Sequence, residues 1–312
     1  MSFRGRFLRV VPIAALVGLG AGPLASGCGA RTELAAPPLG EAGEDVTIDQ
    51  DAAEDVLPHI DHFVDAPIPT DCPDAGSTLI YVISSENELF SFYPPTLAFT
   101  KIGTIACPNT QSTPYSMAVD RLGTAYSVFA DGTLWQISTA NASCKPTPYI
   151  PQPQDTPFFN FGMGFAGDQT GESLYIADAN FNVNSLGLAT LDTKTFTRDF
   201  IANFQPELPR CELTGTGDGR LFAFCLFTSG TGSEIAEIDP KTAKVIAVNK
   251  LKLGDASDAF AYAFWGGYFW IFYGPGGSTT VTRYDPASFA EDNLASLQQT
   301  IVGAGVSTCA PQ

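Results

Sequence analysis

The chain has 312 residues, 45% of them hydrophobic, which is enough to bury a substantial core and excludes a wholly disordered protein. It carries 16 Lys and Arg against 33 Asp and Glu, a formal net charge of −17. This acidity makes nucleic acids and anionic lipid surfaces poor partners, so we expect no nucleic-acid binding.

Residues 1–27 have the pattern of a secretory signal peptide. Three arginines precede an apolar run over residues 10–22, which is too short to span a bilayer comfortably. The junction LASGC, residues 24–28, resembles the lipobox of bacterial lipoproteins, in which the cysteine is lipidated and becomes the mature N-terminus. Ala25 stands where the lipobox usually has leucine, so ordinary cleavage after a small residue is the alternative. The resemblance implies export and a membrane anchor on Cys28, at the outer membrane or cell surface of the envelope.

Residues 28–76 are predicted to form a disordered acidic tether. Residues 29–76 contain 12 acids, one basic residue and one aromatic, a composition that cannot bury enough apolar surface to fold alone. The chain's two histidines, His59 and His62, lie in this stretch, where we expect solvated linker and not a metal site. The segment from residue 77 onward therefore has no histidine, which excludes histidine-based catalysis and histidine metal sites there. The sequence predicts no cofactor and no metal.

From residue 77 onward, short runs rich in aromatic and β-branched residues alternate with Gly, Pro, Asp and Asn, a pattern that indicates an all-β fold. Two units recur along this part of the chain. A strand followed by a turn occurs five times, with steps of 45, 54, 47 and 46 residues, at the equivalent positions Tyr93, Ser138, Asp192, Asp239 and Asp285. A hairpin occurs four times, over residues 115–129, 161–178, 211–225 and 262–273.

Two strands are left without a partner by these repeats. The strand over residues 78–84 comes before the first turn unit and has no hairpin partner, and the chain ends with the isolated strand GAGVSTCA, residues 303–310. If the two pair, the last strand completes the first blade and the ring of sheets closes. Through its repeats, which cover residues 77–312, the sequence resembles the β-propeller family. We therefore expect a five-bladed β-propeller closed by its C-terminal strand.

Three further stretches carry a narrower resemblance. GCGARTEL (residues 27–34), CELTGTGDGRLFAFC (residues 211–225) and IVGAGVSTCAP (residues 301–311) are similar to segments of exported propeller lipoproteins of myxobacteria. The resemblance implies an exported propeller, and it implies no catalytic activity.

Six cysteines remain besides Cys28, an even number in a chain with an export signal, so we expect three disulfides. Cys211 and Cys225 lie symmetrically about Asp218 within one hairpin. Of the 15 possible sets of pairs, the predicted topology selects Cys211–Cys225 within the hairpin, Cys72–Cys309 where the ring closes, and Cys107–Cys144 between the first two blades. Paired cysteines provide neither a thiolate nucleophile nor a cysteine zinc site.

Carboxylates and aromatic rings are the remaining candidates for a site. We expect them on the face where the loops joining successive blades meet the middle loop of each blade. The candidate ligand-binding residues are Tyr115, Phe161, Asp178, Asn180, Glu212, Asp258 and Tyr262. Aromatic rings beside asparagines suit a glycan, peptide or protein ligand, so we expect a binding or scaffold module. A carboxylate glycoside hydrolase is the alternative, and a structural envelope protein without a pocket is a third interpretation.

Overall fold

The computed structural model describes residues 57–60, 72, 78–108, 110–168, 171–179, 184–227, 231–255, 259–274 and 276–312. The chain divides into two compact units, residues 1–52 and 53–312, and every described residue belongs to the second. The predicted signal peptide, Cys28 and most of the predicted tether lie outside the described residues.

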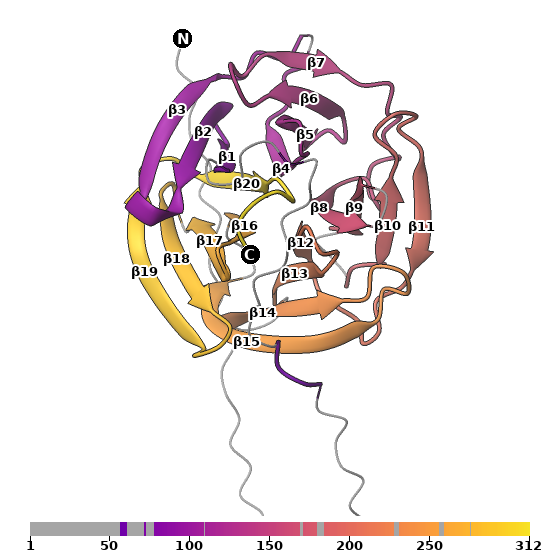
Figure 1. Cartoon of the computed structure of the whole chain (residues 1–312). Coiled ribbons are helices and arrows are strands. Elements are labelled where there is room, and N and C mark those ends of the chain that lie inside the picture. The colour runs from indigo at the N-terminus through magenta and orange to yellow at the C-terminus, as the bar shows by residue number, and fades with distance from the viewer. Residues whose placement is uncertain are drawn as a thin grey trace, which may run out of the picture. The chain divides into compact units, whose positions relative to one another are not determined.

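Five four-stranded antiparallel sheets are arranged in a ring (Figure 1), which confirms the predicted five-bladed all-β propeller. From inner to outer strand, the blades are blade 1 with β20 (Ile301–Val306), β1 (Ile80–Ser84), β2 (Glu88–Tyr93) and β3 (Ala98–Thr104); blade 2 with β4 (Pro114–Val119), β5 (Thr124–Phe129), β6 (Leu134–Ser138) and β7 (Cys144–Pro146); blade 3 with β8 (Phe161–Asp168), β9 (Gly171–Asp178), β10 (Leu188–Leu191) and β11 (Arg198–Ala202); blade 4 with β12 (Cys211–Gly215), β13 (Leu221–Leu226), β14 (Thr231–Ile238) and β15 (Val245–Asp255); and blade 5 with β16 (Ala259–Trp265), β17 (Tyr268–Gly274), β18 (Thr279–Asp285) and β19 (Ala290–Leu297). A short 3₁₀ helix, Pro94–Thr96, links β2 to β3. Among the described residues, no helix is both long enough and apolar enough to cross a membrane.

Blade 1 combines strands from both ends of the propeller sequence. β20 pairs antiparallel with β1, with Ile80 opposite Val306, as the predicted closure requires. The strand, however, covers residues 301–306 and not 303–310. Residues 307–310 instead form a turn in which Ala310 N–H donates to the Ser307 carbonyl (2.9 Å). The turn satisfies these backbone groups locally, so the strand ends at Val306.

The outer turn of every blade repeats one backbone conformation. A non-glycine residue with φ between 57° and 59° occurs four residues after each predicted turn position, at Leu97, Ala142, Phe196, Ala243 and Phe289. Such left-handed conformations are uncommon for residues other than glycine. In the third blade the Asp192 carboxylate accepts hydrogen bonds from the backbone N–H groups of Lys194 and Thr195, both at 2.7 Å. The aspartate therefore caps the turn as expected, and the predicted repeat register is confirmed.

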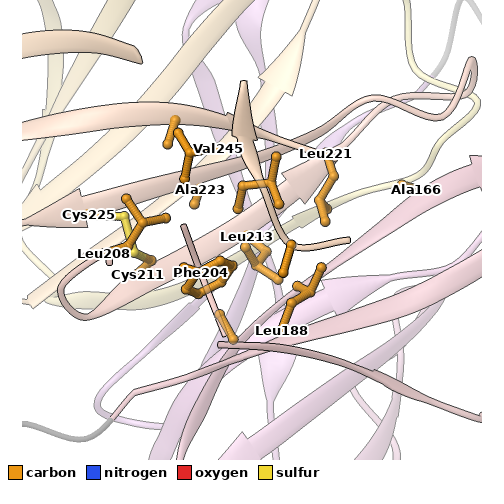
Figure 2. Packing of buried hydrophobic residues seen from close by; sticks show 14 residues of the cluster. Ala166, Leu188, Phe204, Leu208, Cys211, Leu213, Leu221, Ala223, Cys225 and Val245 are labelled. Atoms are coloured by element: carbon orange, nitrogen blue, oxygen red, sulfur yellow. A yellow bond between two sulfur atoms is a disulfide. The ribbon is translucent and has the colours of Figure 1, made fainter. Parts of the chain in front are cut away.

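The hydrophobic core is divided into five clusters, one between each pair of neighbouring blades. β13 shows why the sequence of a strand can be a continuous apolar run, because all six of its residues are buried. Alternate residues point to opposite faces of a strand, so Leu221 and Ala223 belong to the cluster between blades 3 and 4 (Figure 2), whereas Phe222 and Phe224 belong to the cluster between blades 4 and 5. β13 is therefore buried on both faces of its sheet, whereas outer strands such as β11 are partly exposed.

All three predicted disulfides are present. Cys211 and Cys225 face each other in the β12–β13 hairpin, with their Cα atoms 4.1 Å apart. The other two pairs are Cys72–Cys309, with a sequence separation of 237 residues, and Cys107–Cys144, with a separation of 37 residues. Together they confirm the pairing that the ring topology selects.

A short segment of the predicted tether packs on the propeller. In the described residues Leu57–Ile60, His59 is exposed, but only 2% of the surface of Ile60 is exposed. Ile60 belongs to the hydrophobic cluster between blades 4 and 5, and the Pro58 carbonyl accepts a hydrogen bond from Val248 N–H of β15 (2.9 Å). The apolar side chains within this acidic stretch therefore contribute to the core.

Candidate functional site

The inner strands approach one another so closely that glycine is needed at their contacts. A Cβ atom on Gly162 of β8 would lie 2.1 Å from the Cys211 carbonyl oxygen of β12, and one on Gly303 of β20 would lie 2.9 Å from the backbone N of Met117 in β4. The inner strands of the five blades run parallel to one another, so all of them begin at the same end of the propeller. We call the end where they begin the mouth, and the opposite end, where Cys72–Cys309 lies, the latch face.

Glu212 is the central polar group near the mouth. It lies in β12 of blade 4, and its Oε2 accepts a hydrogen bond from Ser116 Oγ of blade 2 at 2.5 Å. The backbone N–H of Met163, in β8 between these two blades, also donates to the carboxyl. The side chain therefore links the inner strands of three blades. Burial raises the pKa of Glu212 to about 8, against the opposing effects of the Ser116 hydrogen bond and the nearby Arg210.

The stability of the protein is expected to fall between about pH 5 and pH 8 because of Glu212. The pKa of this group is higher in the folded chain than its ordinary value of 4.5. In this window the folded state keeps a proton that the unfolded state has released. The stabilising contribution is therefore complete below the ordinary pKa and is lost as the pH rises toward 8, at up to about 1.4 kcal/mol per pH unit. In Glu212→Gln this contribution to the pH dependence is expected to be absent, as measured by urea unfolding at several pH values.

Glu207→Gln is a matched control, because Glu207 is exposed and its partner in the structure is the Asn184 side chain, at 2.9 Å. This variant is expected to keep the pH dependence of the unchanged protein. If Glu212→Gln keeps it as well, Glu212 does not hold a proton in the folded state.

Tyr115 and Arg210 lie next to Glu212 at the mouth. Their side chains are hydrogen-bonded to each other, and the Arg210 guanidinium lies over the Phe260 ring, 4.8 Å from its centroid. The pKa of the Tyr115 hydroxyl is raised, mainly because the side chain is buried. The structure thus brings together two predicted site residues, Tyr115 and Glu212, around an arginine that the sequence analysis did not single out. Arg210 comes directly before β12, so its place beside Glu212 follows only from the strand boundary.

Three other predicted residues have structural partners. Asp178 is buried, and its two carboxylate oxygens accept the backbone N–H groups of Phe158 (2.7 Å) and Leu186 (2.9 Å). The Tyr262 hydroxyl donates to the Phe222 carbonyl, and burial raises the pKa of Tyr262. Phe161 has no exposed surface and pairs with Asp178 across β8 and β9. Asp178 therefore holds two loops near the mouth. The remaining predicted residues, Asn180 and Asp258, lie outside the described residues.

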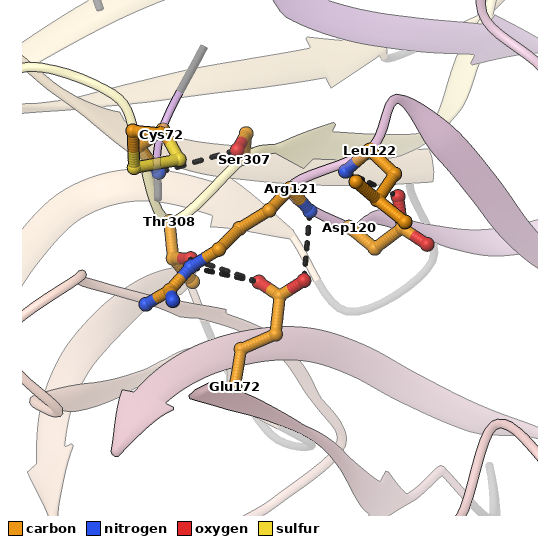
Figure 3. Close-up of a disulfide and its surroundings, with 8 residues drawn as sticks. Cys72, Asp120, Arg121, Leu122, Glu172, Ser307 and Thr308 are labelled. Atoms are coloured by element: carbon orange, nitrogen blue, oxygen red, sulfur yellow. Dashed lines mark hydrogen bonds and ion pairs between the residues drawn. A yellow bond between two sulfur atoms is a disulfide. The ribbon is translucent and has the colours of Figure 1, made fainter. Parts of the chain in front are cut away.

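The latch face is closed by a polar cluster beside the Cys72–Cys309 disulfide (Figure 3). Glu172 accepts a hydrogen bond from the backbone N–H of Arg121 (2.7 Å) and another from the Thr308 hydroxyl (2.8 Å). Arg121 Nε donates to the same hydroxyl at 2.7 Å, and Arg121 and Thr308 are both buried. These contacts tie blades 2 and 3 to the turn that follows β20.

An aromatic pocket of about 310 Å³ opens between blades 1 and 5. It is formed by the β2–β3 turn and the β16–β17 hairpin, both at the latch face, and its walls are Pro94, Pro95, Leu97, Trp265, Gly266, Tyr268, Trp270, Arg283 and Leu294. Both indole N–H groups are used inside the protein: Trp265 Nε1 donates to the Thr78 carbonyl (3.0 Å) and Trp270 Nε1 to the Trp265 carbonyl (3.2 Å). We call these nine residues the aromatic pocket.

None of the predicted ligand-binding residues lines the aromatic pocket. The sequence predicts the site at the mouth instead, and it indicates only a blade hairpin for the aromatic residues around Gly266 and Gly267. Two aromatic residues flanking a Gly-Gly turn are a signal that could have marked this place. The second wall, however, comes from the first repeat, and only the closed ring brings the two together.

A second pocket, of about 400 Å³, lies against the ends of β5, β6 and β7. Its lining is mainly small or polar, with Thr124, Gln136, Thr139 and Lys145 among its residues and no aromatic ring. Within the described ranges, no group of three or more His, Cys, Asp or Glu side chains is placed to hold a metal ion.

No protein-family model and no curated protein matches the sequence. Among solved structures, the chain is similar to one in the crystal structure of a nidogen/laminin complex, with 15% identity, a TM-score of 0.46, and coverage of 75% of this chain and 99% of that chain. TolB from Acinetobacter baumannii is 14% identical, with a TM-score of 0.43, and the match covers 72% of this chain and 55% of the TolB chain. The Dos1 propeller is 12% identical, with a TM-score of 0.39, and the match covers 75% of this chain and 72% of the Dos1 chain. The five-bladed assignment rests on the sheets themselves.

Proposed function

We propose that this protein is an exported, lipid-anchored β-propeller that acts as a binding module at the cell envelope. The aromatic pocket between blades 1 and 5 is the observation that carries the proposal. Its volume suits one ring or a short side chain, and the half-buried Trp265 and Tyr268 side chains provide a surface for apolar contacts. Trp270 is only 4% exposed, and the Arg283 guanidinium lies over the Tyr268 ring, 4.8 Å from its centroid. The chemistry of the lining favours an extended peptide that inserts a proline or another apolar side chain.

Export is supported by the three disulfides. Such bonds form and persist in oxidising compartments, and here they fix the ring closure, the first interblade connection and one hairpin. The lipobox-like junction at Cys28 supports the lipid anchor.

The carboxylate glycosidase is the less favoured alternative. Hydrolysis of a glycosidic bond usually requires a pair of carboxyl groups on opposite sides of the scissile bond. Near the mouth, Glu212 is buried in contacts with Ser116, and both oxygens of Asp178 are held by backbone amides. Neither of these two described carboxyl groups is presented to a substrate.

The aromatic pocket is expected to bind peptides that contain proline. We would probe the mature chain, carrying Cys28→Ser, on a proline-containing peptide array and a glycan array, and screen it for glycoside hydrolysis. Leu294→Arg places a long charged side chain at the pocket wall, at a position that is 36% exposed. It is expected to weaken peptide binding at least about tenfold, which corresponds to about 1.4 kcal/mol.

Phe200→Arg is the matched control, because Phe200 is an apolar residue on the outer strand β11, is 49% exposed and lies outside the pocket. It should leave binding unchanged. Glycan binding that Leu294→Arg abolishes would correct the ligand class, whereas hydrolysis, or binding unaffected by Leu294→Arg, would contradict the proposal.

The lipid anchor has its own test. Cys28→Ser removes the thiol that would carry the lipid and is expected to release the protein from the membrane fraction into the soluble fraction of the producing bacteria. Thr32→Ala, four residues further on, is the control and should stay with the membrane. Equal partitioning of Cys28→Ser and the unchanged protein would show that Cys28 carries no anchor.

A further inference from the structure

The segment Leu57–Ile60 contacts the outer edge of blade 4. β15 is the outermost strand of this blade, so one of its edges has no strand partner in the described part of the sheet. The Val248 N–H on that edge donates to the Pro58 carbonyl at 2.9 Å. Pro58 favours an extended conformation for the preceding residue, Leu57. One backbone hydrogen bond, without a β-ladder in the described residues, therefore joins the segment to a sheet edge of the kind that peptides bind.

A buried asparagine forms a hydrogen bond with the backbone of this segment. Asn249 of β15 has no exposed surface, and its Oδ1 accepts a hydrogen bond from Ile60 N–H at 3.1 Å. The same oxygen lies 3.1 Å from His59 Nδ1. A buried amide oxygen requires hydrogen-bond donors, and here the segment provides two contacts to Oδ1, whereas the buried Nδ2 has no hydrogen-bond partner among the described residues. Asn249 thus provides a hydrogen-bond acceptor for the backbone of a peptide that lies along the edge of β15.

Apolar side chains anchor the segment on both faces of blade 4. Ile60 belongs to the cluster between blades 4 and 5, whereas Leu57 packs against the cluster between blades 3 and 4. The His59 ring meets the Phe289 ring edge to face, with centroids 5.0 Å apart. Two aliphatic anchors three residues apart, a proline and one ring contact define the pattern Leu-Pro-x-Ile.

We propose that the edge of β15 is a peptide-recognition site and that Leu57–Ile60 is its built-in ligand. A segment with the same pattern, supplied in trans, occupies this site once the chain's own segment is displaced. The site is separate from the aromatic pocket, which lies between blades 1 and 5. Its ligand class is an extended peptide with aliphatic residues on both sides of a Pro-x pair.

The covalent link explains why the built-in ligand prevails. Ile60 is followed after eleven residues by Cys72, which is bonded to Cys309. A ligand tethered over so short a distance has an effective concentration on the order of millimolar. A free peptide at micromolar concentration therefore cannot displace it, and the site is open to a partner only when the segment is altered or withdrawn.

The test uses the full mature chain, carrying Cys28→Ser, and a fluorescent peptide of residues 55–62, DVLPHIDH. Ile60→Asp removes the buried anchor. We expect the peptide to bind the Ile60→Asp variant at least about tenfold more tightly than the unchanged chain, measured by fluorescence anisotropy. Adding Asn249→Ala to Ile60→Asp is expected to abolish that gain. Ile150→Asp is the matched control, since Ile150 is 80% exposed, and it should behave like the unchanged chain.

Amide hydrogen exchange provides a second measurement that does not depend on peptide affinity. The Val248 amide should exchange more slowly in the unchanged chain than in Ile60→Asp, and adding the peptide should slow it again in the variant. Ile60→Ala gives a milder version should the aspartate disturb folding. Equal exchange at Val248 in all three chains, or a peptide that binds the unchanged chain and the variant equally well, would overturn the proposal. A dimer of the unchanged chain in which the segments are exchanged would overturn the assignment in cis.

Discussion

Deletion of residues 301–312 is expected to abolish cooperative folding of the propeller. The deletion removes β20, the inner strand of blade 1, which pairs with β1 and lies against β4 and β16. It exposes one edge of β1 and part of the cluster between blades 5 and 1, to which Ile301 and Val306 contribute buried side chains. Exposed strand edges promote aggregation. The shortened chain should therefore elute as aggregates in size-exclusion chromatography and show no sharp thermal transition by circular dichroism.

The deletion also removes the Cys72–Cys309 disulfide, so a control must separate the strand from the bond. The double substitution Cys72→Ser and Cys309→Ser keeps β20 and loses only the crosslink. In the chain-entropy model, a crosslink over a separation of 237 residues contributes about 5 kcal/mol, and often less in practice. This variant should remain a folded monomer with a lower melting temperature. A deleted chain that melts like the full chain would contradict the closure by β20.

Gly162→Ala is expected to destabilise the propeller by at least about 3 kcal/mol, because overpacking a close contact forces the backbone to move. The new Cβ would lie 2.1 Å from the Cys211 carbonyl oxygen and 2.7 Å from the Glu212 Cα. These neighbours are backbone atoms of the next inner strand and cannot move independently of blade 4. The melting temperature should fall by about 6–12 °C, measured by differential scanning calorimetry.

Gly276→Asn is the matched control for Gly162→Ala. A Cβ atom at Gly276 would have no heavy atom within 4 Å, and its φ of 74° is one that asparagine tolerates better than most residues. Its melting temperature should change little. A Gly162→Ala variant as stable as this control would show that the inner strands have more room at the axis than the structure gives them.

The blade count and the disulfides could be predicted because both depend on spacing along the chain. Five turn units at steps of 45 to 54 residues fix the number of blades, and the left-handed residue in each outer turn, from Leu97 to Phe289, confirms their register. The isolated first and last strands could then only pair with each other. Cysteine pairing followed from the same topology.

The candidate site was less predictable because its parts come from different repeats. The aromatic pocket joins Pro94 and Pro95 of blade 1 to Trp265 of blade 5, and these are neighbours only after the ring has closed. Arg210 reaches the mouth from the loop before β12. The sequence predicts a disordered tether around Ile60, because the average composition of the acidic stretch does not reveal single apolar residues that can anchor it.

The closure of blade 1 also dictates the order of events during synthesis. Blades 2 to 5 are each encoded by one continuous stretch, so each can fold as it emerges, whereas the inner edge of β1 stays unpaired until β20 is made. Cys72 is the first of the six paired cysteines to be made and its partner, Cys309, is the last. Oxidation of cysteines in the order of their appearance would join Cys72 to Cys107. Correct maturation therefore requires either a Cys72 thiol that stays reduced until Cys309 has been made or thiol–disulfide exchange that corrects an early mispairing.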